Sequence, residues 1–144
     1  LNGRELYHQE CARCHNMKAG IRVGPALQGA VQGHTREQLL FDILNPSGTI
    51  LSLYRSYIVT TNDGGVFGGI IATETPGTLT LRSGPGEEET ILRGRITEVR
   101  ASDVSLMPEG FEDNLSRQEI ADIISFMQAG YLIEEGQETA SESP

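Results

Sequence analysis

Residues 10–17 read ECARCHNM and contain both cysteines of the chain, Cys11 and Cys14, followed directly by His15. Two residues separate the cysteines, a spacing that occurs in cofactor-attachment sites, metal sites and redox-active thiol pairs. The chain has 144 residues, enough for one compact domain. The chemistry of this short stretch therefore decides which fold is expected around it.

The pattern C-x-x-C-H is the attachment signal for c-type haem. In that chemistry the sulfurs of Cys11 and Cys14 add across the two vinyl groups on one edge of the porphyrin. His15 then coordinates the iron through Nε2. We therefore expect one covalently bound haem c, because covalent attachment holds the cofactor in a small and partly open protein.

Three other interpretations of the cysteine pair remain open. A thioredoxin-like redox pair would be surrounded by a βαβ pattern, which the sequence lacks. A structural zinc site needs four ligands, and only His8 and His34 are left as candidates. A plain disulfide would close a strained ring over two intervening residues.

Composition and charge narrow the class of protein further. Hydrophobic residues make up 38% of the chain and aromatic residues 6%, with no Trp, so a large apolar cofactor would complete a lean core. The net charge of −9, concentrated after Ala101, argues against a nucleic-acid partner. The apolar runs are too short to span a membrane.

Helical patterns occupy the two ends of the chain. A short helix is expected over residues 3–10, and a long Gly-rich loop over residues 16–34. The middle helix begins after a capping box at Thr35 and Gln38 and ends at Asn45-Pro46. A last helix follows a second capping box at Ser116 and Glu119, and Gly130 suits its C′ position.

Between these helices the hydrophobic period changes from 3.6 to 2, which predicts about five short strands over residues 56–100. Asp63-Gly64 and Pro85-Gly86 supply turns, and Glu87–Glu89 are expected on a solvent edge. We interpret the strands as an insertion in a single domain of residues 1–132. Residues 133–144 are expected to form a disordered acidic tail.

The order of these features resembles the class I c-type cytochromes, in which an N-terminal helix runs into CxxCH and crosses a C-terminal helix. The matching stretches are CARCH at 11–15, GPAL at 24–27, ILNPS at 43–47 and SLMPEG at 105–110. The chain resembles in particular the C-terminal haem-binding domain of membrane-bound-dehydrogenase-like multidomain proteins of planctomycetes and verrucomicrobia. This resemblance covers residues 3–132 and implies a mainly α fold, with a small antiparallel β-meander inserted between the middle helix and the axial-Met loop.

The resemblance also assigns roles to single residues. Gly3 would permit close helix approach, and Tyr7 would pack on the last helix near Ile123 and Phe126. The carbonyl of Pro25 would accept a hydrogen bond from His15 Nδ1, which fixes the tautomer of a histidine ligand.

The resemblance implies Met107 as the sixth iron ligand, because it lies in the loop before the last helix. The other candidates are less suited. Met17 is two residues from His15 and cannot reach the opposite haem face, whereas Met127 suits core packing. His8 and His34 are expected at the surface.

The remaining candidate haem contacts are apolar walls and charged or polar edge groups. The expected walls are Leu27, Leu39, Leu40, Ile43, Leu106 and Phe111. The groups expected near a haem propionate are Arg22, Arg55 and Tyr57.

His/Met ligation of a haem iron leaves no vacant position and favours one-electron transfer rather than catalysis. We therefore expect a non-enzymatic electron-transfer domain that exchanges electrons with a redox partner protein or a fused catalytic domain. Haem c attachment implies a periplasmic or otherwise extracytoplasmic location, with an export signal outside this chain. If Met107 is displaceable, a ligand sensor or a peroxidase-like enzyme is the alternative, and a structural haem module is a third possibility.

Overall fold

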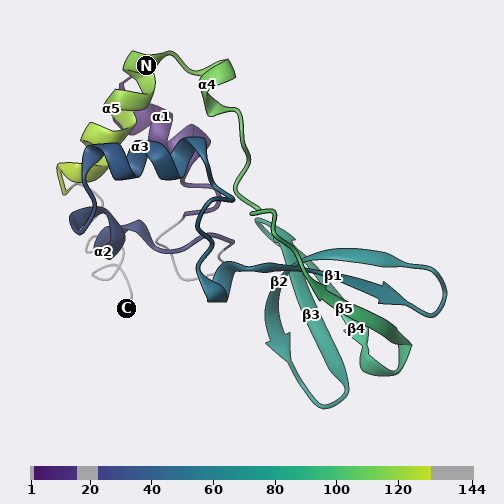
Figure 1. The fold of residues 1–144 in the computed structure, drawn as a ribbon. Coiled ribbons are helices and arrows are strands. Elements are labelled where there is room, and N and C mark those ends of the chain that lie inside the picture. The colour runs from purple at the N-terminus through teal and green to yellow at the C-terminus, as the bar shows by residue number, and fades with distance from the viewer. Residues whose placement is uncertain (1, 16–22, 131–144) are drawn as a thin grey trace.

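The computed structural model describes residues 2–15 and 23–130, and within them the helices and strands form two parts (Figure 1). The helical part contains α1 (Gly3–Glu10), α2 (Leu27–Gln32), α3 (Arg36–Leu44), α4 (Phe111–Asn114) and α5 (Arg117–Gln128). The strands are β1 (Ser56–Thr61), β2 (Val66–Glu74), β3 (Thr78–Gly84), β4 (Glu87–Leu92) and β5 (Ile96–Ala101). Two 3-10 turns, η1 (Ser52–Tyr54) and η2 (Arg93–Arg95), lie in the connections.

The core of the helical part is the crossing of α1 and α5. Gly3 lies so close to α5 that a Cβ atom there would clash with the carbonyl of Asp122. Tyr7 is 2% exposed, and its ring centroid lies 5.4 Å from that of Phe126, the packing that the resemblance implies. The buried stripe of α5 completes this core with Ile120, Ile123, Ile124 and Met127.

Local capping sets the ends of these helices. The side chains of Asn2, Thr35 and Ser116 each accept a hydrogen bond from the backbone N–H three residues on, so all three caps form complete capping boxes. Those of α3 and α5 are the two that the sequence predicts. Gly130 has φ +82°, which agrees with its expected C′ position.

The expectation of a mainly α fold with a small β-meander is wrong. The strands hold almost as many residues as the α-helices, and they form one five-stranded antiparallel sheet. The sheet has a hydrophobic core of its own, made by Val59, Leu79, Leu81 and Ile91, each at most 2% exposed. Because the apolar faces of the strands pack on one another, the sheet is a second structural layer and not a minor appendage.

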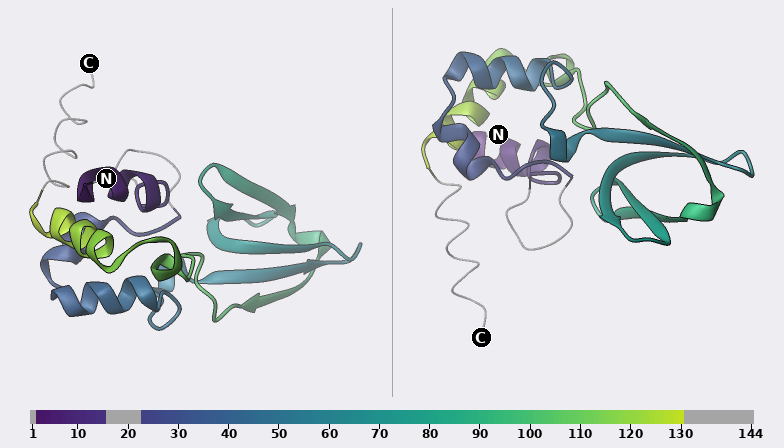
Figure 2. Two further views of the ribbon diagram at one scale, coloured as in Figure 1. Left: turned by 90° about the horizontal axis from the view of Figure 1, so that it is seen from above. Right: turned by 60° about the horizontal axis from the view of Figure 1, so that its bottom comes forward.

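The sheet is also not a simple meander. Its strand order is β4-β3-β2-β1-β5, so the last strand returns to pair with the first. This pairing places Ala101 opposite Tyr57. The chain therefore leaves the sheet beside the point where it entered, and both connections run back to the helical part (Figures 1 and 2).

The Gly-rich stretch of residues 16–34, expected as a loop, contains the helix α2. Val31 of this helix is 3% exposed and belongs to the helical core. Tertiary burial thus forms a helix that local propensity does not favour. The expected tail of residues 133–144 lies outside the described residues.

We predict that Gly3→Ala destabilises the protein by about 1–3 kcal/mol, because the new methyl group overlaps backbone of α5 that cannot move independently. Denaturant unfolding measures the change. The control is Gly94→Ala, where no atom lies within 4 Å of the added Cβ. Equal stability of the two variants would contradict a close crossing of α1 and α5.

Candidate functional site

The cysteines and His15 lie on a compact turn that continues from the end of α1. The backbone N–H groups of Cys14 and His15 both donate to the Cys11 carbonyl, at 3.1 and 2.9 Å. The Tyr7 hydroxyl donates to the His15 carbonyl at 3.2 Å. The buried face of α1 thereby fixes the direction in which this turn leaves the helix.

The imidazole of His15 is held from two sides. Its Nδ1 lies 2.7 Å from the carbonyl oxygen of Pro25, the hydrogen bond that the resemblance implies. Because a carbonyl only accepts, Nδ1 carries the proton, and Nε2 has a lone pair available. Gly24 packs against the ring, since a Cβ there would lie 2.7 Å from His15 Cε1.

Burial shifts the pKa values of the His15 imidazole and the Cys11 thiol in opposite directions. It lowers the pKa of His15, and the hydrogen bond to Pro25 opposes that shift only in part. The ring is therefore neutral at pH 7, the form in which it can act as a ligand. Burial, with smaller contributions from Glu10 and Cys14, raises the pKa of the Cys11 thiol to about 12.

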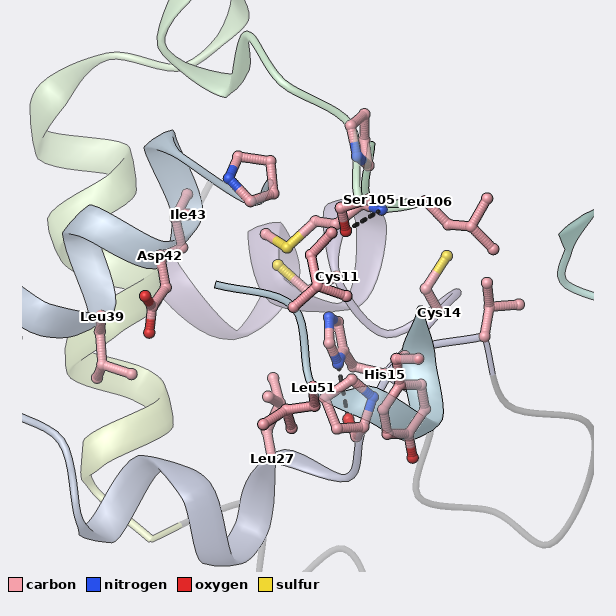
Figure 3. Close-up of a pocket in the computed structure, with 18 of the residues that line it drawn as sticks. Cys11, Cys14, His15, Leu27, Leu39, Asp42, Ile43, Leu51, Ser105 and Leu106 are labelled. Carbon is pink, nitrogen blue, oxygen red and sulfur yellow. Dashed lines mark hydrogen bonds between the residues drawn. The ribbon is translucent and has the colours of Figure 1, made fainter. Parts of the chain in front are cut away.

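One cavity of about 300 Å³ brings these groups together with segments from elsewhere in the chain (Figure 3). Cys11, Cys14 and His15 line it beside Leu39 and Ile43 of α3. The segment between β5 and α4 contributes four consecutive residues, which are Ser105, Leu106, Met107 and Pro108. Met107 and His15 thus line the same cavity although 92 positions separate them in the sequence.

Most of the expected wall residues lie at the cavity, and a few do not. The cavity is lined by Leu27, Leu39, Ile43, Leu106 and Phe111, together with Pro25. Leu40 is 39% exposed and lies outside the lining. Tyr57 lies in β1, also outside the lining found for the described residues. Arg55 donates to the Ser102 carbonyl, and Arg22 lies outside the described residues.

Several lining residues are not predicted from the sequence, among them His34, Asp42 and Met127. His34 is exposed, as expected, and it also lines the cavity, with its Nε2 3.9 Å from an Asp42 carboxylate oxygen. Met127 belongs to the core, as expected, but also lines the cavity. Asp42 precedes the wall residue Ile43 in α3, and that adjacency is the only signal the sequence offers for it.

The competing interpretations of the cysteine pair fit this geometry poorly. Both thiols are free, so the pair is not a disulfide. A reactive redox thiol needs a lowered pKa, whereas that of Cys11 is raised. Among residues 2–15 and 23–130, no group of three or more His, Cys, Asp or Glu lies together as a metal site.

No helix of this same part of the chain is long and apolar enough to cross a membrane.

Comparison with known proteins identifies no family for the chain. No family model matches the chain, and no curated protein matches it. Among solved structures, a 1.55 Å crystal structure of Hfq, a pleiotropic translational regulator, is similar with a TM-score of 0.31 and 13% identity. That match covers 46% of this chain and 89% of the other, and at this TM-score it carries no functional argument.

These findings correct the resemblance inferred from sequence. Neither family models nor curated proteins supply a c-type cytochrome as a match to this chain. The five-stranded sheet is likewise not part of a mainly α cytochrome c fold. Classing the chain as a metal-binding class I c-type cytochrome, or as the related planctomycete and verrucomicrobial domain, is therefore wrong. Any function assigned to the chain has to rest on the residues of the cavity alone.

The pH dependence of stability tests the burial of His15. An unfolded histidine has a pKa of about 6.5, and the pKa of folded His15 is lower, so the unfolded chain binds the extra proton. We predict that the free energy of unfolding falls as pH drops below about 6.5, before carboxylates contribute below about pH 4.5. Denaturant titrations of the reduced, cofactor-free chain measure this fall.

The variant His15→Gln is expected to show a flatter dependence in that interval, because it lacks the buried imidazole. Identical slopes for the two proteins would place His15 in solvent and contradict the described geometry.

Proposed function

We propose that the chain binds one haem covalently through Cys11 and Cys14 and transfers single electrons. The observation that carries the proposal is the state of His15. One ring nitrogen is bonded to Pro25 and the other is available, beside two free thiols on the wall of the same cavity. An anchored neutral imidazole next to paired thiols is the donor set that covalent haem attachment uses.

The residues present fit this group. A porphyrin iron takes only one or two ligands from the protein, so it does not need the cluster of protein ligands that is absent from the described residues. The cavity offers apolar surface from three segments, with Leu27, Ile43 and Leu106 as examples. When bound, a haem supplies an iron centre that accepts and returns one electron.

Each of the surrounding residues then has a defined task. The Pro25 carbonyl keeps the Nδ1 proton in place, which directs Nε2 to the metal and makes the ligand more basic. Tyr7 and Gly24 restrict movement of the His15 backbone and ring. Met107 is proposed as the second ligand, because it lines the same cavity and its thioether raises the reduction potential.

An electron carrier of this kind requires a redox partner protein or a fused catalytic domain. We propose no enzymatic reaction for the chain itself. An extracytoplasmic location remains a proposal that depends on covalent attachment, because haem c is attached on the outer side of the bacterial cytoplasmic membrane.

Intact-mass measurement tests the attachment. After co-expression with haem-attachment machinery, we predict that the chain gains the mass of one haem, which denaturation does not release. Cys11→Ala and Cys14→Ala together abolish the gain, because both thioether bonds are lost. The control is Arg13→Lys, an exposed residue between the cysteines, which is expected to retain the full mass. A bare chain in the unmodified protein refutes the proposed function.

Met107→Ala tests the second ligand. We predict that this variant keeps the haem, loses the weak far-red sulfur-to-iron band and binds carbon monoxide rapidly when reduced. The reduction potential is expected to fall by a sizeable part of the roughly 0.8 V range that axial ligands set. Met127→Leu is the control, since Met127 lines the same cavity from the core. Loss of the band in Met127→Leu but not in Met107→Ala would exclude Met107 as the ligand.

A further inference from the structure

The segment between β5 and α4 has no regular secondary structure where it carries Met107, yet successive hydrogen bonds hold it. At its start the backbone N–H of Ser102 donates to the Ser56 carbonyl at 2.9 Å. The Ser56 hydroxyl donates to the Val104 carbonyl at 2.9 Å. Ser56 is the first residue of β1 and only 5% exposed, so its hydroxyl is buried against this segment.

A second anchor comes from the turn after α3. The backbone N–H of Ser105 donates to the Ser47 hydroxyl at 3.0 Å. The Ser105 hydroxyl in turn accepts from the backbone N–H of Met107 at 3.1 Å. Anchors from β1 and from the α3 turn thus meet within residues 104–107.

The topology of the sheet makes the first anchor possible. Because β5 pairs with β1, the last strand ends beside the start of the first, where Ser56 lies. Arg55 reinforces the junction, since its guanidinium donates to the Ser102 carbonyl at 3.1 Å and lies 3.6 Å from the Asp103 carboxylate. A meander that ended at its far edge would leave the Met107 segment without these contacts.

We propose that the base of the sheet and the turn after α3 together act as a clamp on this segment, and that Ser56 and Ser47 are positioning residues for Met107 as an iron ligand. This inference rests on the proposed function and gives the sheet a role in it. A flexible loop would let Met107 leave the iron and admit external ligands. Backbone hydrogen bonds from two sides restrict that movement, so the clamp favours the six-coordinate, electron-transferring state.

The experiment compares Ser56→Ala and Ser47→Ala with the unmodified holoprotein. Imidazole titration of the oxidised form measures how easily Met107 is displaced. Each variant is expected to bind imidazole about three- to tenfold more tightly, the change that corresponds to losing one hydrogen bond. The intensity of the far-red band and the reduction potential are both expected to decrease in each variant. Ser47→Thr, which keeps a hydroxyl, is expected to restore the unmodified values.

The matched control is Ser83→Ala, which removes an exposed hydroxyl from β3 that bonds Glu87 at 3.3 Å. It is expected to change neither imidazole affinity nor the band. Amide hydrogen exchange in the same holoproteins adds a readout independent of the iron. The amides of Ser105 and Met107 are expected to exchange faster in the two clamp variants and at the unmodified rate in the control.

The clamp and the proposed function fail in different ways. Unchanged imidazole affinity, band and amide exchange in both clamp variants, with haem attached, overturn the clamp and leave the proposed function standing. Equal effects in Ser83→Ala overturn it as well, because a general loosening of the sheet then explains the result. Absence of haem from the unmodified chain overturns the proposed function and the clamp with it.

Discussion

The close crossing of α1 and α5 at Gly3 is the constraint on which the rest of the helical part depends. Only a residue without Cβ lets the two backbones approach to this distance. The approach buries Tyr7 against Phe126, and the Tyr7 hydroxyl then reaches the carbonyl of His15. One steric requirement near the start of the described chain thereby determines where the cysteine turn lies relative to the core.

A second constraint, the pairing of β5 with β1, brings the distant half of the site into place. The two connections between the sheet and the helices both contribute to the cavity, through Leu51 and Tyr54 on the way in and Leu106 and Met107 on the way out. The pairing is needed because a chain that leaves the helices for the sheet must return beside its starting point to close the same cavity. The sheet therefore positions segments of the site, although no strand residue lines the described cavity.

Sequence reasoning succeeded where the determinants are local. The caps at Thr35 and Ser116 and the turn glycines Gly64 and Gly86, with positive φ, depend on residues within a few positions of one another. Sequence reasoning failed where contacts between distant residues determine the local structure. The formation of α2 depends on burial of Val31, and the strand order depends on which edges pair, neither of which periodicity encodes.

The same division applies to the site. The contact between His15 and Pro25 was expected from the resemblance, which assigned the Pro25 carbonyl to His15 Nδ1, and the structure contains it. His34 is exposed and Met127 lies in the core, as expected, but hydropathy does not show that both also line the cavity. Whole-chain resemblance misled for a related reason. Short motifs describe one cavity, whereas the fold class depends on the sheet between them.

We propose that His15 and Met107 hold the iron of a haem bound to Cys11 and Cys14. An absorption spectrum of the purified holoprotein, taken oxidised, reduced, and reduced with carbon monoxide, tests it most directly. We predict a weak far-red band in the oxidised form and no change on adding carbon monoxide. A spectrum without haem absorption, or a rapid carbon monoxide shift with no far-red band, would contradict it.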